Sequence, residues 1–241
     1  MSLRVLRCAL IVIGALSTLN LVGCNSERPL HIVRADGEFA YEHGKWDQAK
    51  ADFSEYVRRR PEAVDVRYEL AKAHLGADEP KAAIEQLNIA LDVEPLNDNF
   101  LDAQAEAMFK AGQRDALTSL LARNAAERGR VTDYLRLGAY SARMGNPDEA
   151  QQALLTAAKL DNGRSVVPQR ALADFYGSVG DRAKQLRHLR MAYAIEPANE
   201  ETLKEVRRLG EIPGPSFALA PDTITPAGTP QTRTTHVPDD K

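Results

Sequence analysis

ADGEFAYEHGKWDQAKADFSEYVRRRP, residues 35–61, is the stretch that decides the fold of this 241-residue chain. It combines small residues, large apolar residues and a closing proline. The pattern returns 34 residues later, where Ala83 corresponds to Ala49 and Pro95 to Pro61. Small residues let two helices approach closely, and proline ends a helix because it cannot donate the next hydrogen bond. The stretch therefore predicts a helical hairpin that is repeated along the chain.

The same period continues towards the C-terminus and predicts five hairpins and a capping helix. The third hairpin is the most degenerate, because Leu117 stands where Ala is usual and no proline closes it. The fifth departs from the pattern at Gln185, where a small residue is expected. The predicted hairpins span residues 30–63, 64–97, 98–130, 131–165 and 166–199, and the capping helix spans 200–210.

Five such units in register resemble the tetratricopeptide repeat (TPR) family over about 170 residues. The resemblance implies an all-α fold, a right-handed α-solenoid of about five TPR hairpins with a C-terminal capping helix. It also implies that the first helices of the hairpins line a concave groove that binds a protein or peptide partner.

Carried over position by position, the resemblance predicts a groove of mixed charge with three aromatic rings in its N-terminal half. No Asn stands where the chaperone-tail binders of this family use one to hold a terminal carboxylate, so that clamp is not expected. The predicted groove residues are Arg34, Glu38, Tyr41, Tyr68, Lys72, Asp102, Glu106, Phe109, Arg143, Arg170 and Asp174.

The N-terminus has the form of an export signal. Residues 1–23 carry two arginines and then an apolar run, ALIVIGAL, that is shorter than the ~20 residues needed to span a bilayer. The run ends in Leu21-Val22-Gly23-Cys24, which resembles the bacterial lipobox. That resemblance implies cleavage before Cys24 and attachment of diacylglycerol to its sulfur, with acylation of the new amine. An ordinary signal peptide or an uncleaved anchor, with Cys24 incidental, is the alternative.

These features predict an exported lipoprotein of the bacterial cell envelope, with residues 24–29 as a tether. Asn25 does not match the Asp that retains such lipoproteins at the inner membrane, which favours the outer membrane over the inner. Residues 211–241 are rich in Pro, Thr and Gly without an apolar period, and are predicted to be a disordered tail.

Nothing in the sequence points to an enzyme. The formal net charge of -3 argues against nucleic acid as a partner. The chain contains no His-Glu-x-x-His pair, no glycine-rich phosphate loop and no Gly-x-Ser-x-Gly elbow. The two cysteines both lie in the first 24 residues. We therefore expect no catalytic residues, no metal, no cofactor and no small-molecule substrate.

The leading hypothesis is a lipid-anchored TPR adaptor that holds another protein at the cell envelope. Assembly of an envelope complex, in outer-membrane insertion, pilus or secretion machinery, is the process that such lipoproteins suggest. A structural spacer or a regulator of a cell-wall enzyme, without a peptide groove, is the alternative. An enzyme or solute-binding lipoprotein would need an insertion between repeats, and the spacings of 33 to 35 residues leave no room for one.

Overall fold

The computed structural model describes residues 27–222, and this part of the chain forms eleven α-helices and no strand. The predicted signal peptide, the predicted lipid-attachment residue Cys24 and the last 19 residues of the predicted tail lie outside the described residues. The helices are α1 (Leu30–Glu42), α2 (Trp46–Arg59), α3 (Val64–Gly76), α4 (Pro80–Val93), α5 (Asp98–Lys110), α6 (Arg114–Arg128), α7 (Val131–Arg143), α8 (Pro147–Asp161), α9 (Val167–Ser178), α10 (Arg182–Ile195) and α11 (Glu200–Arg208).

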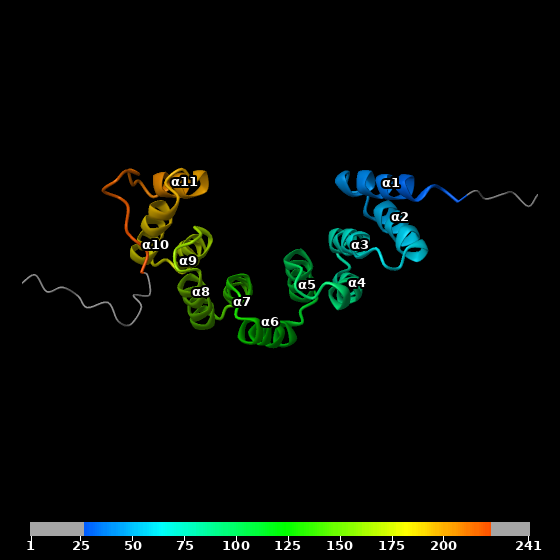
Figure 1. Cartoon of the computed structure of the whole chain (residues 1–241), viewed down its shortest axis with the longest axis horizontal. Helices are drawn as coiled ribbons and strands as arrows, with labels where there is room; N and C mark the ends of the chain where they lie inside the picture. The colour runs from blue at the N-terminus through cyan, green and yellow to red at the C-terminus, as the bar shows by residue number, and fades with distance from the viewer. Residues whose placement is uncertain (1–26, 223–241) are drawn as a thin grey trace, which may run out of the picture.

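The helices are arranged as a wide U in which each helix packs mainly on the next one in the chain (Figure 1). Helices α3, α5, α7 and α9 line the inside of the U, and the even-numbered helices form its outside (Figure 1). Helices α1 and α11 lie at the two tips. The all-α solenoid predicted from the repeats is confirmed.

Small residues bring the two helices of a hairpin together. Gly37 and Gly138 lie inside helices and would not tolerate a side chain. A Cβ atom at Gly37 would lie 2.7 Å from the Phe53 ring, and one at Gly138 would lie 2.6 Å from Cγ of Leu154. The repeated alanines on the second helices, Ala49, Ala83 and Ala150, are fully buried. The small positions of the sequence are therefore packing positions.

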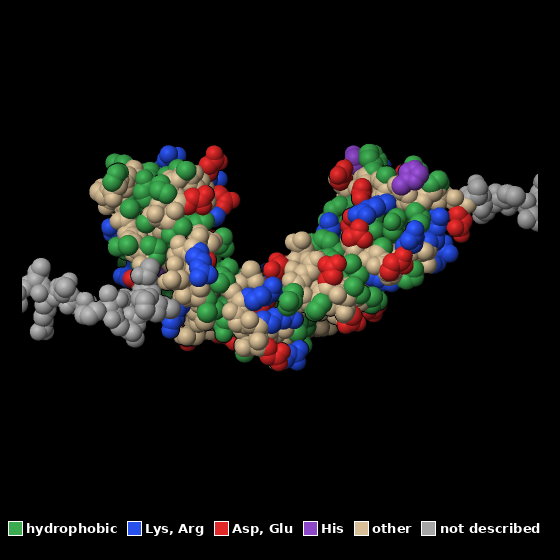
Figure 2. All heavy atoms as spheres, in the orientation of Figure 1, with side chains coloured by type: hydrophobic (Ala, Val, Ile, Leu, Met, Phe, Trp, Pro, Cys, Tyr) green, Lys and Arg blue, Asp and Glu red, His purple; other side chains and the backbone are tan. Residues whose placement is uncertain are grey.

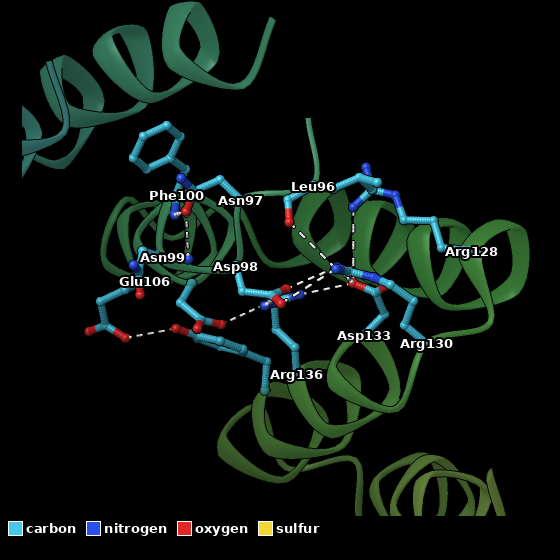
Figure 3. A network of polar contacts seen from close by, with 12 residues as sticks. Leu96, Asn97, Asp98, Asn99, Phe100, Glu106, Arg128, Arg130, Asp133 and Arg136 are labelled. Atoms are coloured by element: carbon cyan, nitrogen blue, oxygen red, sulfur yellow. Dashed lines mark hydrogen bonds and ion pairs between the residues drawn. The ribbon is translucent and has the colours of Figure 1, made fainter. Parts of the chain in front are cut away.

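The third hairpin is held together differently from the others. Helices α5 and α6 pack on each other much less than the helices of the other hairpins do. Charged residues instead join α5 and α7 (Figure 3). The Arg136 side chain is only 4% exposed and donates to Asp133 at 3.0 Å, Asp98 at 3.1 Å and Asp102 at 2.5 Å. Arg130 also binds both Asp98 and Asp133. An ion-pair network thus replaces apolar packing in the middle of the array.

The prediction that disorder begins at residue 211 is wrong for residues 211–222. This segment crosses the outer side of α10, where Phe217 is buried with Leu189 and Val206. Nε of Arg190 donates to the Phe217 carbonyl oxygen at 2.7 Å, and the Leu219 amide donates to the Arg190 carbonyl oxygen at 3.1 Å. No sixth hairpin follows within residues 27–222, so the last hairpin leaves an apolar flank. A single aromatic residue covers that flank, which a composition rich in Pro and Thr does not reveal.

One buried histidine in the last hairpin predicts a pH dependence. Nδ1 of His188 lies 2.8 Å from Oε1 of Gln169, and burial lowers the pKa of His188 to about 4 from its ordinary 6.5. The unfolded chain therefore binds a proton below pH 6.5 that the folded chain refuses until about pH 4. We expect the stability to fall by about 1–3 kcal/mol as the pH falls through this window, measured by thermal unfolding.

A His188→Gln variant is the control for this expectation, because its amide can still donate to Gln169. It should lose this part of the pH dependence while keeping the part that comes from the carboxylates. The same pH profile in both proteins would contradict the assignment to His188.

Candidate binding groove

The candidate site is the concave face, formed by the inner helices. Figure 2 shows the hollow between the two arms of the U, with acidic, basic and apolar side chains along it. The residues that the sequence predicts for the groove come from α1, α3, α5, α7 and α9. The structure brings most of them into contact with one another, from one hairpin to the next.

At the N-terminal end, Arg34 binds three acidic side chains and so joins α1 to α3. Its guanidinium donates to Glu38 on its own helix at 2.9 Å. It also donates to Asp65 and Glu69 of the next hairpin, each at 2.7 Å. Burial raises the pKa of Glu69 although Arg34 opposes this shift. Arg34 is therefore already neutralised within the chain.

Two of the three predicted aromatic rings are occupied by a lysine of the same chain. Nζ of Lys72 lies 5.0 Å from the ring centroid of Tyr41 and 4.9 Å from that of Tyr68. Both distances fall within the range of cation–π attraction. The Tyr68 ring also lies 5.2 Å from Phe100. These rings are thus partly used to join α1, α3 and α5.

The third predicted ring, Phe109, belongs to a cluster that connects α5 with α7. The Arg143 guanidinium lies 4.1 Å from the Phe109 centroid, and its Nη1 donates to Glu106 at 2.6 Å. The Tyr140 hydroxyl donates to the same carboxylate at 3.0 Å. The bond from Arg143 lowers the pKa of Glu106, and burial raises that of Tyr140. Asp102, the remaining predicted residue of α5, is bound to Arg136.

The open part of the groove lies one hairpin further on, between α7 and α9. A cavity of about 550 Å³ opens there between the two inner helices. Its size falls within the ~300–1,000 Å³ typical of ligand pockets. Most of its wall is apolar, and Val167 at its rim is 51% exposed. The lining residues are Leu135, Gly138, Ala139, Ala142, Arg143, Leu154, Val167, Ala171, Asp174, Phe175 and Ser178.

Sequence reasoning placed two of these residues in the groove, Arg143 and Asp174, and missed the apolar wall. A signal was present in Gly138, Ala139 and Ala142, where α7 carries small residues on its inner side. Small side chains leave the space between α7 and α9 unfilled. The predicted residue Arg170 lies beside this cavity and is bound to Glu201 of α11.

Two further searches concern the described part of the chain. Within residues 27–222, no three His, Cys, Asp or Glu side chains are placed to hold a metal ion. None of the helices in these residues is both long enough and apolar enough to cross a membrane.

Comparison with known proteins bears on the repeats. A tetratricopeptide repeat family model matches residues 37–100. No curated protein matches the sequence. A thermophilic TPR protein of Thermus thermophilus has a similar structure, with 19% identity and a TM-score of 0.52, covering 75% of this chain and 98% of that one.

Two MamA structures are also similar. The MamA protein has 19% identity and a TM-score of 0.49, covering 77% of this chain and 98% of that one. MamA of Desulfovibrio magneticus RS-1, from residue 41 to its end, has 16% identity and a TM-score of 0.49, covering 71% and 97%. At such identities the likeness to the Thermus protein concerns the fold alone. The chain therefore contains tetratricopeptide repeats at residues 37–100, and its described helices have the fold of a tetratricopeptide repeat solenoid.

Proposed function

We propose that this chain is a lipid-anchored adaptor that binds a protein or peptide partner in its concave groove at the bacterial cell envelope. The single observation that supports binding is the apolar cavity between α7 and α9. Elsewhere along the groove, the polar side chains largely bind one another. An apolar hollow in a polar groove suits a large side chain of a partner, because burying such a side chain contributes about 1.5–3 kcal/mol.

Ala139→Trp tests this part of the proposal. Ala139 is exposed and lines the cavity, so a large side chain can cover the hollow without entering the core. We expect partner binding to weaken about 10- to 100-fold, the equivalent of one buried apolar side chain. The measurement is co-purification after crosslinking in the native cell, with circular dichroism to show that the helices are intact.

Gln152→Trp is the matched control, because Gln152 is exposed on the outer helix α8. It should leave co-purification unchanged. Equal recovery of partners with Ala139→Trp and with the control would favour the alternative, a structural spacer or a regulator of a cell-wall enzyme that does not use its groove.

The lipid anchor rests on the sequence around Cys24, and the position of Arg28 gives it a structural consequence. Arg28 follows Cys24 by four residues and donates to Asp52 at 2.7 Å and to Glu55 at 2.6 Å, both on α2. Four extended residues span at most about 14 Å. A lipid on Cys24 would therefore hold the first hairpin close to the membrane surface, where an assembly factor for an outer-membrane, pilus or secretion complex would meet its partner.

Cys24→Ser should move the protein from the membrane fraction to the soluble fraction, because it removes the only proposed acceptor of the lipid. Two or more acyl chains give stable anchoring, so the shift should be nearly complete. The measurement is fractionation of cells followed by immunoblotting. Cys8→Ser, at the other cysteine, should leave the protein in the membrane. Retention of the Cys24→Ser protein in the membrane fraction would refute lipidation at this residue.

A further inference from the structure

The cavity between α7 and α9 carries one acidic side chain that has no partner. Asp174 lies on the cavity wall and makes no hydrogen bond or ion pair with any residue in 27–222. It remains exposed at the residue level, so a bound group can reach it. Burial of the surrounding groove raises the pKa of its carboxyl group, which shows that its charge is poorly solvated there.

The cations near Asp174 are bound to other acids. Arg143, on the opposite wall, donates to Glu106 at 2.6 Å and lies against the Phe109 ring. Arg170, one turn before Asp174 on α9, is bound to Glu201 of α11. Glu205, also on α11, adds a further negative charge that raises the pKa of Asp174. The surroundings of the cavity therefore leave one negative charge without a counterpart.

An apolar hollow with one free carboxylate specifies two features of an occupant. The apolar wall favours a large aliphatic or aromatic side chain. The carboxylate favours a cation beside it, because a charged group in a partly desolvated place gains more from an opposite charge than it does in water. A second acidic group in the occupant would be repelled by Asp174 and by the two glutamates of α11.

We propose that this cavity binds a peptide segment of the partner in which a large apolar side chain is accompanied by a Lys or Arg that pairs with Asp174. The proposal rests on the proposed groove function and specifies the chemistry of its ligand. The apolar side chain enters between Ala139 and Ala171, and the cation lies against the α9 wall. The rest of the peptide continues along the concave face.

The test is selection of a random-peptide phage library on the detergent-solubilised protein purified from its native cell. We expect the selected peptides to combine a large apolar residue with a nearby Lys or Arg. One selected peptide is then synthesised, together with a copy in which Gln replaces its cation. The affinities of both peptides are measured by fluorescence anisotropy for the wild type and for each variant.

Asp174→Asn should weaken binding of the cationic peptide about fivefold, as expected for a partly exposed ion pair. The Gln copy should bind the wild type about fivefold more weakly as well, and should not distinguish wild type from Asp174→Asn. Ala139→Trp should weaken both peptides about tenfold or more. Asp148→Asn, which makes the same charge change in the exposed first turn of the outer helix α8, should change nothing.

The two levels of the proposal fail in different ways. If Asp174→Asn binds the cationic peptide as tightly as the wild type while Ala139→Trp weakens it, the role of Asp174 is overturned and the groove function stands. If no peptide is selected, or if Ala139→Trp leaves the affinity of the selected peptides unchanged, the groove function is overturned as well.

Discussion

Arg136→Met is expected to lower the free energy of unfolding by about 3–5 kcal/mol, because it removes one side of a buried ion pair. Arg136 is 4% exposed at its side chain and Asp133 is fully buried. Methionine can fill the space of the arginine stem but cannot neutralise the carboxylate. Asp133 would keep Arg130 at 2.8 Å, while its bond to Arg136 at 3.0 Å would be lost.

The position of Arg136 makes this loss more than local. The guanidinium joins α7 to Asp98 and Asp102 of α5, across the hairpin whose own helices pack least on each other. In a solenoid each unit contacts only its neighbours, so damage in the middle uncouples the two halves. Thermal unfolding should show a lower midpoint and a broader or split transition.

The double variant Asp133→Leu/Arg136→Met separates charge from packing. Replacing both members of a buried pair by apolar residues is often nearly neutral, whereas removing one member is costly. The double variant should therefore be more stable than Arg136→Met alone, and the difference gives the coupling between the two residues. A double variant that is no more stable than Arg136→Met would show that the buried charge of Asp133 is not the cause.

Phe53→Ala is expected to cost about 3–5 kcal/mol, and the loss should be confined to the first hairpin. Phe53 is 1% exposed, and its ring fills the space that Gly37 leaves on α1. Removing the ring leaves a cavity between α1 and α2 that a glycine cannot fill. Because the hairpin lies at one end of the array, the distant hairpins have no contact with the damage.

Hydrogen exchange resolved by segment measures this effect. Residues 30–59 should lose protection while residues 147–195 keep it. Phe39→Ala is the matched control, since Phe39 is on the same hairpin and is 53% exposed. It should change stability by no more than ~0.5 kcal/mol. Equal costs for the two variants, or loss of protection in α8 to α10, would contradict the repeat packing described here.

The helical hairpins could be predicted because their signals are local in the chain. A small residue, a large apolar residue and a glycine or proline recur at a fixed spacing, and each hairpin buries its own apolar faces. Ala49 and Ala83 are fully buried, as their repeat positions require. The degenerate third hairpin was also recognisable, but its sequence did not show that Arg136 would replace apolar packing there.

The candidate site could be predicted only in part. Repeat positions placed residues such as Arg34 and Glu106 on the inner helices, but their partners lie 31 to 37 residues away. Which charges cancel across that distance depends on how consecutive hairpins are stacked. The cavity between α7 and α9 depends on the same stacking, because it is a space left by small residues and has no residue of its own.

By itself the sequence determined the class of fold and the positions that face the groove, because helix period and hairpin closure are encoded within about 34 residues. The tertiary structure decided which groove residues remain free, and it placed Phe217 on the last hairpin. The physical reason is that ion pairs, cavities and buried flanks arise between units. Their energy depends on distances in space, which spacing along the chain does not specify.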